Sequence, residues 1–343
     1  MVGMASRMKD IARDLSVSVI TVSKVLRNHP DISEATRNRV LKRMKELNYR
    51  PNLAARSLVT GKSYTVGLIV PDLVHPFFAE LAKGASRVLR ERAYGLLISS
   101  SEENVELERQ EIDQMLARGV DALLIASTQS TVESFRQIEE RSVPYVLLDR
   151  HFAGLAANFV GIDDERAGIL ATEHLISAGC RRIAHIRGPE VSTGIGRWTG
   201  YRRALLRHGL DVPDSLVVLE DTSDESADTS GYEAMKKLLA IDPRPDGVFC
   251  HNDPTALGAM RAIVEAGLNI PGDVALIGCG NVVYAPLLMV PLSSIDQDNF
   301  AMGARAGELA LSLLSAKAKT KPQSILMPSK VVVRASSSRS VAN

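Results

Sequence analysis

Apolar side chains recur at helical spacing in three short segments near the N-terminus, residues 8–15, 19–26 and 34–47. Ser18 and Ser33 precede the second and third segments and can cap these helices with their hydroxyl groups. The side chains that we expect to share a small core are Met8, Ile11, Ala12, Leu15, Val22, Val25, Leu26, Leu41, Met44 and Leu47. The pattern therefore predicts an all-α head of three short helices.

The second predicted helix leaves polar and apolar side chains on its outer surface. It follows the first helix after the short break Ser16-Val17. In a helix-turn-helix the second helix enters the DNA major groove, where residues near its start meet base edges and hydroxyl groups contact phosphates. The candidate DNA contacts on this helix are Ser18, Val19, Ile20, Thr21, Ser23 and Lys24.

From residue 64 the pattern changes to short apolar strands that alternate with amphipathic helices. Such alternation is typical of parallel strands joined by crossover helices. A second set of the same kind begins near Phe159. The sequence therefore predicts an α/β body of two doubly wound lobes. Such sheets bind ligands beyond the carboxyl ends of their strands, so two facing lobes form a cleft between them.

Residues 51–63 separate the head, residues 1–50, from the body, residues 64–343. Residues 52–58 follow Pro51 and can form only one or two helical turns, which are hardly stable alone in water. Residues 60–63, Thr-Gly-Lys-Ser, then make a flexible exit. On its own this segment is a linker.

The charge of the chain is divided between its two ends. Residues 1–62 contain 13 Lys and Arg against 5 Asp and Glu, a net charge of +8, and the rest contains 28 against 35, a net charge of −7. A basic head on an acidic body is the electrostatic pattern of a phosphate-backbone contact, although a merely solvated basic face is the alternative.

Composition excludes several other classes. No apolar run approaches the roughly 20 residues that cross a bilayer, and the N-terminus lacks the features of a secretion signal, so we expect a cytoplasmic protein without membrane contact. Cys180, Cys250 and Cys279 are widely spaced and form no C-x-x-C pair, which argues against a disulfide framework or a zinc site. We expect no metal and no cofactor.

Three stretches of the head carry a specific resemblance: MKDIARDLSVSVITVSKVL, ISEATRNRV and LNYRPNLAARSL. Together they resemble the lactose/galactose repressor (LacI/GalR) family. The resemblance implies that Val19, Ile20 and Lys24 read bases, Lys24 by donating to guanine and the two apolar side chains by contact with groups such as thymine methyls.

The resemblance also gives the segment after Pro51 a function. It implies a hinge helix that becomes ordered on DNA and contacts the minor groove through Asn52, Ala55 and Leu58, with Leu58 as an apolar wedge between base pairs. The hinge helices of a homodimer pair there. We therefore expect a dimer on a pseudo-palindromic operator with a deformable pyrimidine-purine step at its centre.

The body resembles a periplasmic sugar-binding protein, which implies three crossings of the chain between the lobes. We place these crossings near Ile162, Ser294 and Pro322. Lobe one then consists of residues 64–161 and 295–321, and lobe two of residues 162–294 and 322–338. The cleft between them is the expected effector site.

Family-matched polar and aromatic residues are the candidate effector contacts. They are His75, Phe77, Phe78, Asp149, Arg197, Asn252, Asp253 and Gln297. Asp253 has a structural alternative, because it precedes Pro254 at the start of a predicted helix. The family usually has an aspartate after the strand VALIG, but this chain has Cys279-Gly280-Asn281. The missing carboxylate argues against a plain hexose as the ligand, and Asn281 is the candidate partial substitute for it.

The sequence thus predicts a DNA-binding transcription regulator, most simply a repressor, controlled by a small ligand such as a carbohydrate or its derivative. An effector that is a partner protein is the alternative. A dehydrogenase is disfavoured because the glycines of Gly194-Ile-Gly196-Arg-Trp-Thr-Gly200 do not follow a strand directly. No other catalytic motif appears, so we expect no enzyme. A stand-alone solute-binding protein leaves residues 1–62 unexplained.

Overall fold

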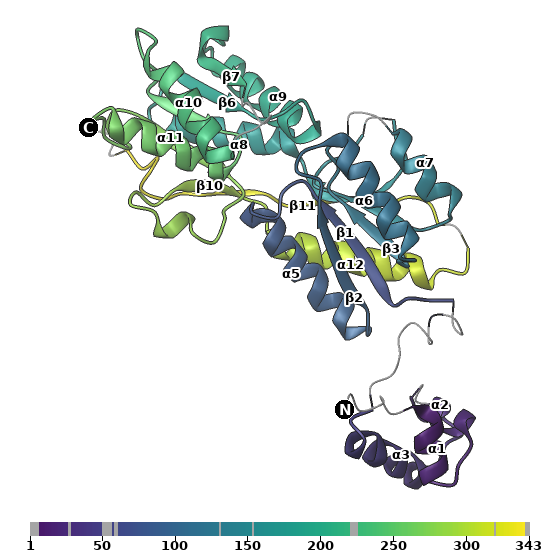
Figure 1. The fold of residues 1–343 in the computed structure, drawn as a ribbon. Coiled ribbons are helices and arrows are strands. Elements are labelled where there is room, and N and C mark those ends of the chain that lie inside the picture. The colour runs from purple at the N-terminus through teal and green to yellow at the C-terminus, as the bar shows by residue number, and fades with distance from the viewer. Residues whose placement is uncertain are drawn as a thin grey trace. The chain divides into compact units, whose positions relative to one another are not determined.

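The computed structural model describes residues 7–26, 29–49, 57, 61–129, 132–152, 154–219, 226–318 and 320–339 (Figure 1). Its contacts divide the chain into two units, residues 1–63 and 64–343. The described helices of the first unit, the head, are α1 (Met8–Asp14), α2 (Val19–Leu26) and α3 (Glu34–Glu46). In the part of the chain that is described, no helix has the length and apolarity to cross a membrane.

Two serine caps and a small apolar core define the head. The Ser18 hydroxyl accepts from the Thr21 N–H at 3.0 Å, and the Ser33 hydroxyl accepts from the Thr36 N–H at 3.3 Å. The buried core residues are Ile11, Ala12, Val22, Val25 and Val40, with Met44 and Leu47 packed against them.

One predicted core residue of the head is wrong. Leu41 is 46% exposed, and Val40 takes the buried position. Val40, Met44 and Leu47 follow the i, i+4, i+7 spacing of one helix face, whereas Leu41 lies about 100° further around the helix.

The body contains two six-stranded sheets. The first has the order β2-β1-β3-β4-β5-β11, and the described pairings are all parallel. Its strands are β1 (Thr65–Val70), β2 (Gly95–Ser100), β3 (Ala122–Ile125), β4 (Tyr145–Leu148), β5 (Asn158–Ile162) and β11 (Ser324–Met327). Alternate residues of β1 pack on opposite faces: Val66 and Leu68 belong to the core under α5 and α12, and Ile69 belongs to the core under α6 and α7. These helices are α5 (Pro76–Glu91), α6 (Val105–Ala117), α7 (Glu133–Glu140) and α12 (Asn299–Ser315).

The second sheet repeats this plan with the order β7-β6-β8-β9-β10-β12. Its strands are β6 (Ile183–Arg187), β7 (Val217–Leu219), β8 (Gly247–Cys250), β9 (Ala275–Cys279), β10 (Ser293–Asp296) and β12 (Lys330–Val332). Only the β10–β12 pairing is antiparallel among the described ones. The described α-helices of this lobe are α8 (Asp164–Ser177), α9 (Ser192–Arg207), α10 (Ala227–Leu239) and α11 (Asp253–Glu265). The body therefore has the predicted class of two doubly wound lobes.

The chain passes between the sheets after β5, after β10 and between β11 and β12. The third passage lies between Met327 and Lys330, later than the predicted position near Pro322. The reason is that β11 extends the first sheet, with Ile325 opposite Val160. Residues 324–327 therefore belong to the first lobe, contrary to the predicted boundary.

Candidate functional site

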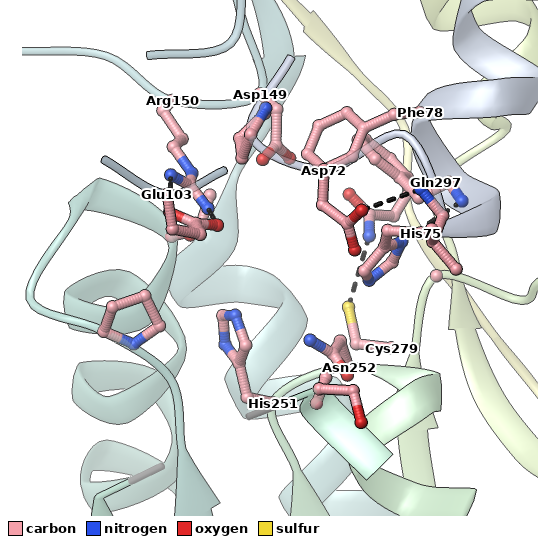
Figure 2. Close-up of a pocket in the computed structure, with 18 of the residues that line it drawn as sticks. Asp72, His75, Phe78, Glu103, Asp149, Arg150, His251, Asn252, Cys279 and Gln297 are labelled. Carbon is pink, nitrogen blue, oxygen red and sulfur yellow. Dashed lines mark hydrogen bonds and ion pairs between the residues drawn. The ribbon is translucent and has the colours of Figure 1, made fainter. Parts of the chain in front are cut away.

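A cavity of about 450 Å³ lies between the two lobes of the body (Figure 2). Loops after β1, β2 and β4 form its wall on the first lobe, and loops after β6, β8 and β9 form its wall on the second. β1 lies between β2 and β3, and β6 lies between β7 and β8, so both sheets present a topological switch point to this side. The cavity is thus where doubly wound sheets bind ligands.

Most of the predicted effector contacts line this cavity. They are His75, Phe77, Phe78, Asp149, Arg197, Asn252 and Gln297. Their contact with a ligand stays a prediction, since the structure shows only that their side chains converge. The lining residues that sequence reasoning missed include Asp72, Glu103, Arg150, Thr193 and His251.

Arg197 is held by two buried acceptors. Its Nε donates to Asp164 at 2.9 Å and its Nη1 donates to the His251 carbonyl at 2.8 Å. The side chains of Arg197 and Asp164 are only 4% and 5% exposed. Burial raises the pKa of Asp164 to about 7, although the Arg197 charge opposes this shift. The guanidinium is thereby fixed in the wall of the second lobe.

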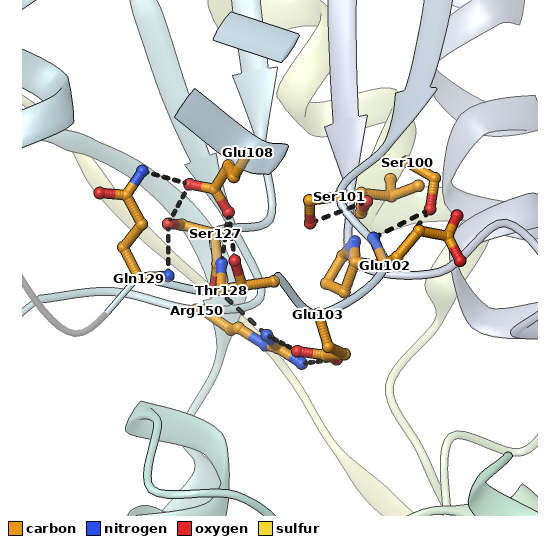
Figure 3. A network of polar contacts seen from close by, with 11 residues as sticks. Ser100, Ser101, Glu102, Glu103, Glu108, Ser127, Thr128, Gln129 and Arg150 are labelled. Carbon is orange, nitrogen blue, oxygen red and sulfur yellow. Dashed lines mark hydrogen bonds and ion pairs between the residues drawn. The ribbon is translucent and has the colours of Figure 1, made fainter. Parts of the chain in front are cut away.

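Arg150 is paired in the same way within the first lobe. Its Nη2 and Nη1 donate to the two carboxylate oxygens of Glu103 at 2.7 and 3.0 Å, and Nη1 also donates to the Ser127 carbonyl at 3.3 Å (Figure 3). Glu103 and Arg150 follow β2 and β4 closely. The rule that polar residues after strands face the cleft applies to both, and could have identified them.

Glu108 on α6 holds the loop after β3 that contacts Arg150 (Figure 3). It is fully buried, and its carboxylate accepts from the hydroxyls of Ser127 and Thr128 at 2.6 and 2.8 Å and from the Gln129 amide at 2.8 Å. The loop after β3 is therefore anchored to α6. Its Ser127 carbonyl in turn orients Arg150.

Three acidic residues of the cavity wall have left-handed backbone conformations. The φ angles are 49° at Glu102, 52° at Glu103 and 59° at Asp149. Such angles are strained for side chains other than glycine and cluster at functional sites. Burial raises the pKa of Asp149, although the nearby Arg197 charge opposes this effect. The first lobe thus holds carboxylates at the cavity in an otherwise unfavourable geometry.

The two histidines of the cavity are neutral near pH 7. Burial, together with the Arg150 charge, lowers the pKa of His75 to about 4. Its Nδ1 accepts from the Phe77 N–H at 3.2 Å, so the proton resides on Nε2. Burial also lowers the pKa of His251 well below the ordinary value. His75 can therefore donate a hydrogen bond without adding positive charge.

Asp253 does not line the cavity, which differs from the prediction. Its carboxylate accepts from the Val282 N–H at 2.9 Å and from the Ser294 hydroxyl at 2.6 Å. These bonds tie the start of α11 to the loop after β9 and to β10. The neighbouring Asn252 caps α11, accepting from the Thr255 N–H at 2.8 Å, and also lines the cavity.

Cys279, at the end of β9, lines the cavity at the position where the resemblance leads us to expect an aspartate. The Gln297 amide nitrogen donates to the Cys279 thiol at 3.4 Å, and the Gln297 Oε1 is buried without a partner among the described residues. Asn281 does not replace the missing carboxylate here. Its Oδ1 accepts from Arg334 at 2.6 Å, and its side chain is absent from the described cavity wall.

The predicted DNA contacts of α2 are accessible. Val19 and Ile20 are 37% and 67% exposed, so both apolar side chains are open to a partner. Lys24 forms an ion pair with Asp31, and this contact lowers the pKa of Asp31. The predicted hinge residues Asn52, Ala55 and Leu58 lie outside the described residues. No cluster of metal-binding side chains occurs in the described part of the chain.

Comparison with known proteins matches both parts of the chain. Residues 7–52 match the family of bacterial regulatory proteins described as the lacI family, and residues 172–337 match the periplasmic binding protein-like domain. Catabolite control protein A of Priestia megaterium is 35% identical over 302 residues, which cover 88% of this chain and 90% of that protein. The ribose operon repressor of Escherichia coli K12 is 35% identical over 310 residues, covering 90% and 91%. A solved structure of the lac repressor dimer bound to operator and the anti-inducer ONPF has a TM-score of 0.84 and 26% identity, and the match covers 97% of this chain and 99% of that one.

Proposed function

The chain belongs to the LacI family of bacterial regulatory proteins, and from this premise we propose that a small hydroxylated ligand, a carbohydrate or its derivative, binds the cavity between the lobes. The protein is a DNA-binding transcription regulator and no enzyme. Beyond this activity, we propose where the effector binds, which class of molecule it is and how its binding is coupled to DNA binding.

The observation that carries the proposal is the presence of both donors and acceptors in the cavity wall. Asp149 offers carboxyl oxygens as acceptors, while the His75 Nε2 and the Asn252 amide offer donors. A sugar hydroxyl is both donor and acceptor, so adjacent hydroxyls match such a wall. Phe77 and Phe78, in edge-to-face contact at 5.0 Å, add an apolar surface for a ring.

The same geometry provides the coupling. Ligand contacts from both lobes favour one relative position of the lobes, and a ligand with unequal affinity for two positions shifts their populations. In this proposal the lobe position sets whether the hinge segments of a homodimer can become ordered on DNA. Leu58 then acts as the minor-groove wedge, with Asn52 and Ala55 beside it.

The DNA specificity is assigned to α2. Val19 and Ile20 supply apolar base contacts and Lys24 supplies a donor, while Ser18, Thr21 and Ser23 contact phosphates. The operator is pseudo-palindromic with a deformable centre, as the two-fold symmetry of the dimer requires. Such a regulator acts in the cytoplasm.

Thermal melting of the purified protein tests the proposal. The panel contains sugars, polyols, sugar acids, sugar phosphates and nucleosides, because a ligand that binds the native state raises the melting temperature. The expected result is saturable stabilisation by a hydroxylated compound that also changes operator affinity. A panel that leaves both quantities unchanged, with operator binding intact, contradicts small-ligand control and favours a partner protein.

A further inference from the structure

Both arginines of the cavity already have carboxylate partners within the protein. Glu103 accepts from both terminal nitrogens of Arg150, and Asp164 accepts from Arg197. Each pair is formed within one lobe, so neither depends on a ligand. The Arg150 side chain is only 8% exposed, which leaves little of its charge open to the cavity.

The remaining charges of the cavity wall are negative. Among the described residues that line it, Arg150 and Arg197 are the only positively charged side chains, since His75 and His251 are neutral. Four carboxylates line the same wall: Asp72, Glu102, Glu103 and Asp149. An entering molecule therefore meets more negative than positive charge.

An anionic ligand is disfavoured in such a cavity. Proteins bind phosphate and carboxylate groups through guanidinium forks, and Glu103 already occupies the Arg150 fork with two hydrogen bonds. Asp149 beside it is nearly buried, and although burial raises the pKa of its carboxyl group, it offers an anion no positive charge. An uncharged hydroxyl group requires no positive charge.

Building on the proposed small-ligand control, we propose that this cavity accepts uncharged hydroxylated ligands and excludes phosphates and carboxylates, with Glu103 as the residue that enforces the exclusion. Glu103 is better placed for this role than Asp164. A backbone carbonyl also accepts from each arginine, but Glu103 accepts two hydrogen bonds from Arg150, whereas Asp164 accepts only one from Arg197.

We call the proposed exclusion of phosphates and carboxylates from this cavity the charge rule. Inorganic phosphate is the probe for it, because an experiment with phosphate needs no knowledge of the natural effector. We expect the melting temperature of E103Q to rise with phosphate to a plateau, with half-maximal effect at millimolar concentration. The wild-type protein is expected to show only the gradual, unsaturable rise that phosphate causes by exclusion from protein surfaces.

Three further variants make the test specific. E102Q removes the same charge from the neighbouring position of the same wall without releasing an arginine, so it is expected to behave like the wild type. E103Q/R150M also removes the guanidinium that E103Q releases, so we expect it to lose the plateau. Phosphate binding to the basic head is unchanged in this variant, so a plateau caused by the head would persist. E103N serves if E103Q is poorly folded, since asparagine tolerates the positive φ of 52° at this position.

Two results would overturn the charge rule. One is a phosphate plateau of equal size in the wild type, and the other is its absence in both folded variants of Glu103. Saturable stabilisation of the wild type by glucose 6-phosphate or glucuronate would also overturn the rule, but it would leave small-ligand control in place. If the phosphate series behaves as expected while no uncharged compound affects operator binding, the proposed function fails and the charge rule stands.

Discussion

The ion pairs of the head and those at the cavity of the body differ in their exposure. In the head, Lys24 and Asp31 are 34% and 46% exposed, and the Arg43–Asp14 pair is similarly accessible. In the body, the Arg197–Asp164 pair is nearly inaccessible. An exposed pair contributes little and is screened by salt, so a DNA phosphate or base can replace one partner at small cost. A buried pair cannot be exchanged in this way.

This difference suits the two tasks. The head must form and release contacts with a highly charged polymer, and exposed cations do so by exchanging their counterions. The body must distinguish between small molecules, and buried pairs hold its polar groups in fixed positions. The following changes test how far this contrast extends.

The largest effect is expected for Arg197→Met, which leaves the buried carboxylate of Asp164 without its partner. We expect a loss of about 3–5 kcal/mol in the free energy of unfolding of the body. The matched control is Arg43→Met, which breaks an exposed, solvent-screened pair and is expected to change the stability much less. Urea denaturation measures both, and similar losses in the two variants would contradict the contrast.

The second change is Asp253→Asn, which keeps the size of the side chain but replaces one acceptor oxygen with a donor. Because Val282 and Ser294 both donate to this carboxylate, we expect a loss of about 3 kcal/mol in the free energy of unfolding. A variant with unchanged stability but a weakened ligand response would show that Asp253 belongs to the effector site after all.

In the head, Lys24→Ala is expected to change specificity more than stability. The loss of a donor to guanine should reduce discrimination at one symmetric operator position by about 1–3 kcal/mol. Selection of binding sites from random DNA measures the change, with Asp31→Asn as the control that frees Lys24 without removing it. An unchanged recognition sequence for Lys24→Ala would remove this residue from the set that reads bases.

The smallest effect is a change in pH dependence for His185→Phe. Burial lowers the pKa of His185 to about 3, so on acidification below pH 6.5 the unfolded chain binds a proton that the native protein does not. Between pH 6.5 and 5.5 this residue therefore removes about 1 kcal/mol of stability. The variant should lose correspondingly less over this interval, and an identical slope of stability against pH would refute the assignment.

Periodicity predicted the class of fold. Seven of the eight candidate effector residues, chosen after strands with the help of the family resemblance, line the cavity. The errors in the body have a common origin in contacts between distant residues. Nothing in the sequence near Asp253 indicates that Ser294 and Val282 donate to it, or that Glu103 pairs with Arg150. The crossing near Pro322 was misplaced because β11 pairs with β5, which lies far away in sequence.

The return of the chain to the first lobe also affects the order in which the protein can be completed on the ribosome. α12 packs on α5, with the backbone of Leu81 close to Gly303, and β11 forms the edge of the first sheet. Roughly 200 residues separate these helices, which corresponds to about 10–40 s of synthesis. During that interval the apolar side of α5 awaits its partner, so the first lobe to emerge is among the last parts of the body to close.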